Sequence, residues 1–332
     1  MHSNLNKTNG FTLVELLVAM VLAALVVVPL LSFMTGIMDT DRKEQAKATS
    51  EQEIQAALKY IAQDLEQAVY IYDADGLMRD HSNTAAASGI RDQIPPIAPA
   101  SNCNTATPCQ PVLVFWKRQY NKSVVPLNSS NNNCLINPSS CNDTFVYSLV
   151  GYYLIKKDND TWSNAARIGR FEIQDGVRAP HPNGSLTLIS PGAGTTNGPS
   201  HGFNLFNLSL IGSSIKDKMN QWKKGVGNYT SQTVVLLDYI DHSTVPNGVS
   251  PVNCPAEMQA VPDYNNANIN NIFKTYSFYA CVNSSKTLAQ VYLRGNALAR
   301  IEPGAATYTT SKSNFFPKAN IQVKGRGFLD VR

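Results

Sequence analysis

One carboxylate, Glu15, lies near the start of a long apolar run and needs a chemical explanation. The run reads FTLVELLVAMVLAALVVVPLLSFM from Phe11 to Met34, and residues 16–38 carry no charge. A helix rises about 1.5 Å per residue, so this run is long enough to cross a hydrocarbon layer of about 30 Å. An ionised side chain inside such a helix costs about 2.5–3.5 kcal/mol. Glu15 therefore requires an opposite charge, a place near the membrane interface, or a function.

The residues that precede the run narrow the alternatives. They read MHSNLNKTNG, with Lys7 as the only Lys or Arg. A secretory signal has a basic start, a short apolar core and a small-residue cleavage site after that core. Here the core is too long, and residues 32–36 make a poor site of that kind. A plain membrane anchor fits the length of the run but gives Glu15 no role.

The string GFTLVE, from Gly10 to Glu15, resembles the N-terminal signature of type IV pilins and of the related type II secretion pseudopilins. The resemblance implies that a prepilin peptidase cuts after Gly10 and that Phe11 becomes the N-methylated first residue. It also implies that Glu15 pairs with the α-amine of a neighbouring subunit when the helices stack into a filament. An α-amine has an ordinary pKa of about 7.7–8.0, so it is largely protonated at neutral pH. The implied pairing therefore gives Glu15 an opposite charge.

The six cysteines all lie beyond the apolar run, and CNTATPC and CLINPSSC contain two local pairs. Zinc is disfavoured because the chain lacks C-x-x-C spacing and none of the five histidines adjoins a cysteine pair. Disulfides indicate an oxidising compartment. Several connectivities are possible in principle. We predict no metal or other cofactor, and we predict the pairs Cys103–Cys109, Cys134–Cys141 and Cys254–Cys281.

Periodicity predicts one long helix at the N-terminal end. Apolar residues recur at three- and four-residue steps between Ile54 and Val69, which is typical of an amphipathic helix. We expect a single helix from about Thr12 to about Val69. Pro29 should bend or locally open this helix, because proline removes a backbone donor and clashes with the preceding turn.

Later segments rich in β-branched and aromatic residues predict an antiparallel sheet against which the helix packs. These segments are 112–119, 144–156, 167–173, 232–240, 275–282 and 288–295. The second and third of them flank a natural hairpin connection. The intervening stretches 76–110, 121–143, 176–202 and 241–272 carry most of the Pro, Gly, Asn and Ser, and we expect surface loops there. Near the C-terminus, ANIQVKGRG fits an edge strand with outward charges.

The predicted fold class is α+β. It consists of a long N-terminal transmembrane and amphipathic helix packed on an antiparallel β-sheet head with long disulfide-stapled loops, which is the pilin plan in outline. We expect a leader peptide at 1–10, a transmembrane half-helix at 11–38, an amphipathic periplasmic half at 39–70 and a β-rich head at 71–332. The resemblance implies a single-pass inner-membrane protein with a periplasmic head that later becomes part of an extracellular pilus.

The large cysteine-stapled head resembles minor pilins of the PilW type and the related J-type pseudopilins. The segment YLRGNALARI and the ending FFPKANIQVKGRGFLDVR also resemble the end of PilW proteins. This resemblance implies a minor pilin at or near the filament tip that primes assembly and supports twitching, adhesion or DNA uptake. Its implied partners are other minor pilins, the major pilin, the prepilin peptidase, the inner-membrane assembly platform and a tip adhesin. A type II secretion pseudopilin shares the same motif and plan.

An enzymatic head is the alternative from another class. The chain contains no H-E-x-x-H motif. One G-x-S-x-G string, GPSHG at 198–202, lies in a stretch expected to be a loop, whereas a nucleophile elbow requires a turn between a strand and a helix. Asp238, Asp241 and His242 lie close together in LLDYIDH, but no nucleophile accompanies them. We therefore predict a protein that is not an enzyme. A membrane-anchored periplasmic binding or hydrolytic domain remains the competing interpretation, and it predicts an intact N-terminus.

A basic stretch, KDKMNQWKKG at 216–225, combines lysines with one tryptophan. Basic groups beside an aromatic ring can hold single-stranded DNA. An acidic residue inside the stretch and the mild net charge of +4 favour a solvated helix or loop instead. We therefore expect a membrane rather than nucleic acid as the non-protein partner. The candidate DNA contacts are Lys216, Lys218, Trp222, Lys223 and Lys224.

Overall fold

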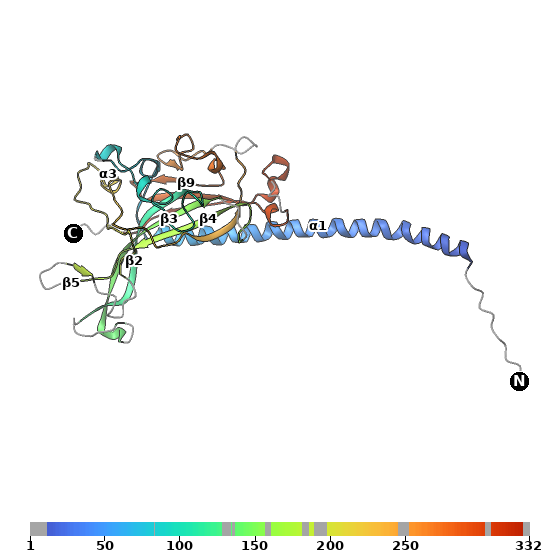
Figure 1. Cartoon of the computed structure of the whole chain (residues 1–332), viewed down its shortest axis with the longest axis horizontal. Coiled ribbons are helices and arrows are strands. Elements are labelled where there is room, and N and C mark those ends of the chain that lie inside the picture. The colour runs from blue at the N-terminus through green and yellow to red at the C-terminus, as the bar shows by residue number, and fades with distance from the viewer. Residues whose placement is uncertain are drawn as a thin grey trace.

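The computed structural model describes residues 12–82, 84–127, 134, 137–156, 161–180, 186–188, 198–244, 252–302 and 307–327. Its longest element is helix α1, Leu13–Glu66, whose N-terminal half extends away from a β-rich head (Figure 1). The predicted long helix is therefore confirmed, but its predicted end at Val69 is wrong. The chain turns at Gln67, and Ala68–Ile71 form strand β1, because all four residues of that strand are buried in pairing with the sheet.

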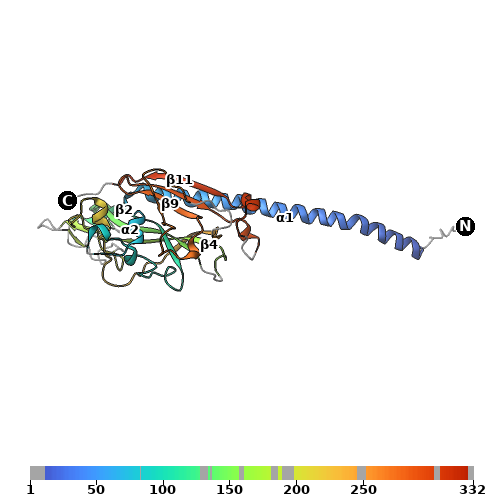
Figure 2. The same ribbon diagram turned by 90° about the horizontal axis from the view of Figure 1, so that it is seen from above.

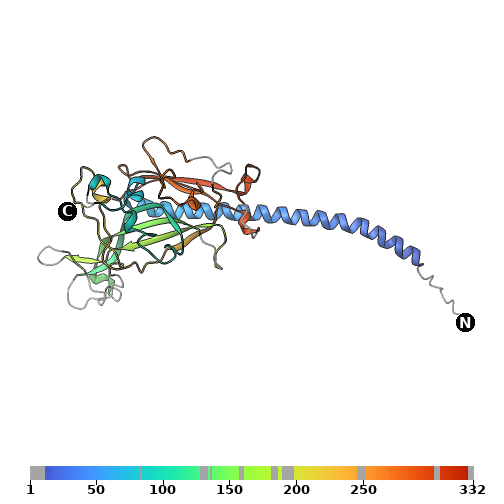
Figure 3. The same cartoon turned by 45° about the horizontal axis from the view of Figure 1, so that its top comes forward.

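Helix α1 continues without interruption through Pro29. Proline provides no N–H to the preceding turn, so one carbonyl of that turn lacks its usual donor. Figure 3 shows a gentle curve in the N-terminal part of α1 and no sharp kink. The helix therefore continues past Pro29, and the expected bend or local opening at this residue stays a prediction.

The head is built on two antiparallel sheets and a small hairpin. The larger sheet has the order β1-β2-β3-β4-β7, with β2 Cys109–Pro126, β3 Cys141–Ile155, β4 Ala166–Gln174 and β7 Val234–Ile240. The smaller sheet has the order β11-β10-β9-β8, formed by Lys318–Lys324, Leu288–Arg294, Phe278–Asn283 and Gln259–Val261. Strands β5 Arg178–Pro180 and β6 Leu186–Leu188 pair with each other.

Short helices occupy the connections between these strands. The α-helical ones are α2 Ala74–Met78 and α3 Ile215–Met219. The 3₁₀ turns are η1 Ala85–Ala87, η2 Arg91–Gln93, η3 Pro138–Ser140, η5 Asn271–Phe273, η6 Leu298–Arg300 and η7 Thr310–Phe315.

All the predicted strand segments contain strands, and the predicted hairpin is the antiparallel pair β3–β4. The predicted C-terminal edge strand is β11, which lies at the edge of the smaller sheet with Lys318 and Lys324 exposed. Three loop predictions are wrong in part. Strands β5 and β6 lie within the stretch 176–202, and β8 lies within 241–272. Strand β2 continues to Pro126 and β3 begins at Cys141, inside the stretch 121–143. These strand ends are polar because both strands leave the body of the sheet and lie partly in solvent. The polar composition therefore predicted a loop instead of strands.

The second half of α1 lies between the two sheets. Figure 3 shows the red smaller sheet on one side of the helix and the green larger sheet on the other, and Figure 2 shows β11 running beside α1. The apolar stripe of the helix fills this space, and Ile54, Leu58, Ile61 and Leu65 are each at most 2% exposed. Burial of such a side chain contributes about 1.5–3 kcal/mol. The predicted amphipathic stripe is therefore the contact between helix and head.

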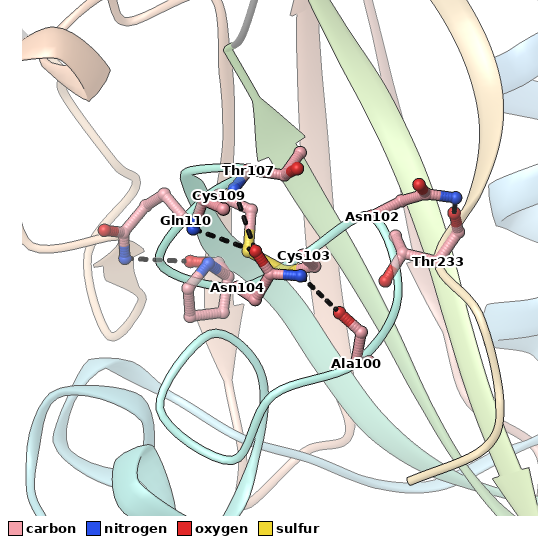
Figure 4. The surroundings of a disulfide bond; sticks show 10 residues. Ala100, Asn102, Cys103, Asn104, Thr107, Cys109, Gln110 and Thr233 are labelled. Carbon is pink, nitrogen blue, oxygen red and sulfur yellow. Dashed lines mark hydrogen bonds between the residues drawn. A yellow bond between two sulfur atoms is a disulfide. The ribbon is translucent and has the colours of Figure 1, made fainter.

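Three disulfides link Cys103 to Cys109, Cys134 to Cys141 and Cys254 to Cys281, which are the pairs predicted from the sequence. The first closes a short loop at the start of β2 (Figure 4). In this loop the Asn104 side chain accepts hydrogen bonds from the backbone of Ala106 and Thr107 and donates one to the carbonyl of Ala100. The bridge and the amide together hold the loop against the head.

Candidate assembly site and its attachment to the head

Glu15 lies in the first turn of α1, where it forms a capping box with Thr12. The N–H and the hydroxyl of Thr12 donate to Glu15 Oε2 at 3.0 and 2.9 Å, and the N–H of Glu15 donates to Thr12 Oγ1 at 3.3 Å. These bonds satisfy two backbone donors that a helix start otherwise leaves without partners. Thr12 was not singled out from the sequence, although the T-x-x-E spacing before an apolar run is the signal for this box.

The proposed cleavage residues, Gly10 and Phe11, lie outside the described residues. Cleavage between them would preserve the peptide bond that joins Phe11 to Thr12. The Thr12 N–H that Glu15 accepts would therefore still be an amide in a mature chain. The capping box is compatible with the chain before and after such processing.

The apolar half of α1 offers a continuous surface for a membrane or for other helices. Every described side chain from Leu13 to Met38 is exposed, and the first helix residue buried by the head is Ala46. Among the described residues, α1 is the one helix whose length and composition suffice to cross a membrane. The candidate assembly site is thus an exposed apolar helix surface with one carboxylate in its first turn.

A buried charge cluster attaches the other half of α1 to the larger sheet. Asp64 of the helix accepts hydrogen bonds from Lys117 Nζ at 3.2 Å, Arg170 Nε at 2.7 Å and the Tyr152 hydroxyl at 2.7 Å. Glu172 forms salt bridges with Lys117 at 2.9 Å and with Arg170 at 2.7 Å. The cluster contains two acids and two bases, so its charges balance only when the helix lies in this register on the sheet.

The protonation of the cluster follows from these contacts. Burial by itself raises the pKa of Asp64, but the hydrogen bond and charge of Arg170, with the charge of Lys117, outweigh it and hold the pKa below its ordinary value. Burial and the nearby Asp64 carboxylate raise the pKa of Tyr152. At neutral pH Asp64 is therefore ionised, and Tyr152 is a neutral donor to it.

A second clamp holds α1 at the end of the head that faces the apolar half. Arg300 of η6 donates from Nε to Ser50 Oγ at 2.9 Å and forms an ion pair with Glu53 of the same helix. The Arg300 guanidinium also lies 4.1 Å from the centre of the Tyr239 ring. The segment YLRGNALARI therefore supplies a direct contact between head and helix.

The acidic residues of LLDYIDH have structural contacts. Asp241 is fully buried and forms a salt bridge with Arg294 at 2.7 Å. Asp238 accepts hydrogen bonds from the N–H and the hydroxyl of Ser163 at 2.9 and 2.8 Å. These bonds anchor β7 to β10 and to the connection before β4.

The tryptophan of the basic stretch belongs to the core of the head. Trp222 is 2% exposed, its ring packs edge-on against Trp116 with the ring centres 5.6 Å apart, and its Nε1 donates to the carbonyl of Asn204 at 2.8 Å. A buried ring cannot stack on a base. The suggestion that Trp222 contacts DNA is therefore wrong, and the sequence did not show that this residue is a core anchor.

The lysines around Trp222 are also partly engaged within the head. Lys216 bridges Asp73 and Asp75 at 2.6 and 2.7 Å. Lys224 donates to the carbonyl of Gly227 at 2.6 Å. Lys218 and Lys223 complete the stretch and flank no exposed aromatic ring there. The stretch contains the short helix α3 and a following turn, in agreement with the favoured interpretation of a helix or loop.

Replacing Trp222 with alanine is expected to destabilise the head by about 3–5 kcal/mol, because it removes a buried ring from an aromatic cluster. Replacing its exposed neighbour Lys223 with alanine should change the free energy of unfolding by less than about 0.5 kcal/mol. Chemical unfolding of the two variants and the parent chain tests this. Equal stability of all three would contradict the assignment of Trp222 to the core.

Comparison with known proteins identifies one region. Residues 5–31 match the family model of the prokaryotic N-terminal methylation motif. No curated protein and no solved structure matches the chain. The matched region includes Gly10, Phe11, Glu15 and the start of α1. The motif supports a type IV pilin-like or pseudopilin-like protein, implies processing by a prepilin peptidase and assembly with pilus components, and suggests a structural role.

The fold agrees with this class. A long N-terminal helix packed on antiparallel sheets, with three disulfides in the head, is a pilin-like α+β arrangement. The apolar half-helix and the motif together fit a membrane-anchored pilin with a periplasmic head. Disulfides in the head are consistent with that compartment.

Proposed function

We propose that this chain is a minor pilin of the PilW type in a type IV pilus and is not an enzyme. The observation that carries the proposal is the methylation motif at residues 5–31, followed directly by an exposed apolar helix. A prepilin peptidase cuts after Gly10, and Phe11 becomes the methylated N-terminus. The mature chain then assembles through α1, with Glu15 paired to the α-amine of a neighbouring subunit.

The proposed domain division follows the burial of the helix. Residues 1–10 are the leader, 11–38 span the inner membrane, 39–70 form the periplasmic half of the helix, and 71–332 form the head. Support for the boundary near 38 comes from charge, because residues 16–38 carry none and Asp39 begins a charged stretch. The head buries the helix only from Ala46 onward.

We also propose a position at or near the pilus tip, where the chain primes assembly and supports twitching, adhesion or DNA uptake. Support comes from the size of the head and from its arm of β2 and β3, which leaves the body of the larger sheet (Figure 1). Such a head suits a capping position better than repeated packing along a shaft. Its partners there are other minor pilins, the major pilin, the assembly platform and a tip adhesin.

The mature N-terminus tests the core of the proposal. Mass spectrometry of the chain purified from its native host should find a protein that begins at N-methylated Phe11. Gly10→Val in the same host should accumulate uncleaved, because the peptidase then lacks its glycine. A chain that begins at Met1, or that is cut beyond Ser32, would exclude pilin-type processing.

Gene deletion distinguishes a pilus subunit from a J-type pseudopilin of type II secretion. Loss of surface pili with normal protein secretion supports the pilus assignment. Loss of secretion with normal pili assigns the chain to the secretion filament, because both filaments use the same N-terminal chemistry.

A further inference from the structure

Strands β2 and β3 continue past the rest of the larger sheet as a two-stranded arm. The pairing of β1 with β2 reaches Lys117, and that of β4 with β3 reaches Ser148, whereas β2 and β3 stay paired as far as Pro126 and Cys141. Figure 1 shows this green arm extending away from the body of the head. Among the described residues, no further strand pairs with either edge of the arm.

The outer edge of β3 presents backbone groups without partners. The N–H of Asp175 donates to the carbonyl of Tyr147 at 2.9 Å, so Tyr147 directs its backbone groups away from β2. Backbone direction alternates along a strand, so Phe145 and Asp143 direct their N–H and C=O groups the same way. Within the described part of the chain, nothing pairs with these groups of Phe145 and Asp143. Such an edge is a template for another strand.

A groove of about 680 Å³ follows this edge. Its lining includes every residue from Asn142 to Tyr147, together with residues of the segments 175–178 and 205–209. The strand edge therefore forms one side of the groove, and the two other segments, with Arg118 and Val125 of β2, complete its lining. A strand of about six residues spans about 20 Å at 3.3 Å per residue. The segments 175–178 and 205–209 flank the strand edge. The groove therefore has room for a single extended chain rather than for the edge of a second sheet.

The groove also contains a cation that has no acidic partner in the described part of the chain. The Arg118 guanidinium lies 3.9 Å from the centre of the Phe145 ring, and among the described residues it forms no ion pair. The second arginine of the groove, Arg178, is neutralised by Asp175 at 3.0 Å. Phe145 is 47% exposed, so the ring and the cation together form a solvent-facing surface.

The remaining carboxylate of the groove is already engaged. Asp143 accepts a hydrogen bond from the N–H of Ser123 at 2.7 Å and another from the Tyr120 hydroxyl, both on β2. These bonds turn the carboxylate toward the partner strand of the arm. Among the residues that the structure describes, Arg118 is therefore the charged group of the groove that lacks an opposite charge.

We propose that this groove binds an extended peptide segment of a partner protein, which adds as a strand to β3 and places an Asp or Glu carboxylate against Arg118. Backbone hydrogen bonds to Phe145 and Asp143 provide affinity, and side-chain contacts with the ring and the cation provide selectivity. The inference concerns the head surface and goes beyond the proposed filament role, because it holds in a pilus or in a secretion filament.

Selection from a phage-displayed library of random peptides, with the full chain in detergent micelles as the target, tests the proposal. Selected peptides should alternate apolar residues and carry Asp or Glu. Fluorescence anisotropy with a synthetic copy of a selected peptide measures its affinity. Methylation of alternate backbone amides of the peptide should weaken binding by about tenfold or more. Arg118→Gln should weaken it by a similar factor. Binding that withstands this methylation would overturn strand addition.

A matched pair of variants isolates the edge of β3. Phe145→Pro removes the outward N–H and leaves the bonds to β2, because that N–H points away from β2. Phe145→Ala keeps the N–H and removes the ring. The proline variant should bind the peptide at least about tenfold more weakly than the alanine variant. Thermal unfolding of both variants verifies that each is folded.

Hydrogen exchange provides a readout that needs no variant. The Phe145 amide should exchange rapidly in the free chain and become protected when the selected peptide is bound. Protection in the free chain would mean that the chain itself covers this edge, which overturns the proposal. A library that yields no peptide protecting this amide would also overturn it.

Discussion

Glu15→Leu is expected to leave the chain cleaved after Gly10 and to remove it from filaments. In the proposed processing the peptidase cuts before the apolar run, so the substitution leaves the cleavage residue in place. In the filament, however, the α-amine of a neighbouring subunit would remain charged and unpaired among apolar helices. An unpaired buried charge costs about 3–5 kcal/mol, which corresponds to a hundredfold or greater loss in an equilibrium. Immunoblots of sheared filaments and of membranes, made from a host that expresses the variant, measure the two fractions.

Two further substitutions separate charge pairing from helix capping. Glu15→Gln keeps an oxygen that can accept from the Thr12 N–H but carries no charge, whereas Thr12→Ala removes the hydroxyl of the capping box and keeps the carboxylate. If pairing with the amine drives assembly, the glutamine variant fails and the alanine variant assembles. Assembly of the glutamine variant at the parental level would show that Glu15 acts as a cap alone.

Asp64→Asn is expected to destabilise the chain by about 3–5 kcal/mol at pH 7. The substitution removes one of the two acids that balance Lys117 and Arg170 in the buried cluster beneath α1. Both cations would then share Glu172 in a site that water reaches poorly. Chemical unfolding followed by circular dichroism in detergent gives the free energy of unfolding for the parent and the variant.

The matched control is an ion pair on the surface of the head. Asp80 accepts a two-point contact from Arg91 and is about half exposed. Asp80→Asn should therefore cost only about 0–1 kcal/mol. Equal losses for Asp64→Asn and Asp80→Asn would contradict the claim that the buried cluster fixes the helix on the sheet.

The loss of stability caused by Asp64→Asn should depend on pH, because Asp64 is ionised in the buried cluster. The pKa of Asp64 is lower in the folded chain than its ordinary value of about 3.9. Its carboxylate therefore contributes stability fully above about pH 4, and this contribution disappears as the pH falls through the lowered pKa. The difference between the parent and Asp64→Asn should be largest at neutral pH and should shrink in acid. A difference that grew in acid would contradict the lowered pKa.

Local patterns determined much of this protein. The spacing of Gly10, Phe11 and Glu15, the period of the apolar residues up to Leu65 and the β-branched segments of the head each depend on neighbours along the chain. For that reason the helix, the main strands and the two local disulfide pairs could be predicted, and the third pair joins the two cysteines that remain. The end of the helix was misplaced by a few residues because Ala68–Ile71 join the sheet, and sheet pairing is not local.

Only the tertiary structure decided which side chains meet across the fold. Asp64 meets Lys117 and Arg170, which are 53 and 106 positions away, because two strands bring them under one face of α1. The basic neighbours of Trp222 predict a surface position for its side chain. The structure instead buries it in the core, because the loop that contains Asn204 folds over it. Periodicity and charge along the chain indicate local secondary structure. Which side chains are buried, and which ion pairs and hydrogen bonds they form, depends on the register of strands that are distant in the sequence. The sequence thus determined the N-terminal motif and the kinds of element. The packing of the head decided how α1 is held and, among the described residues, which strand edge stays open.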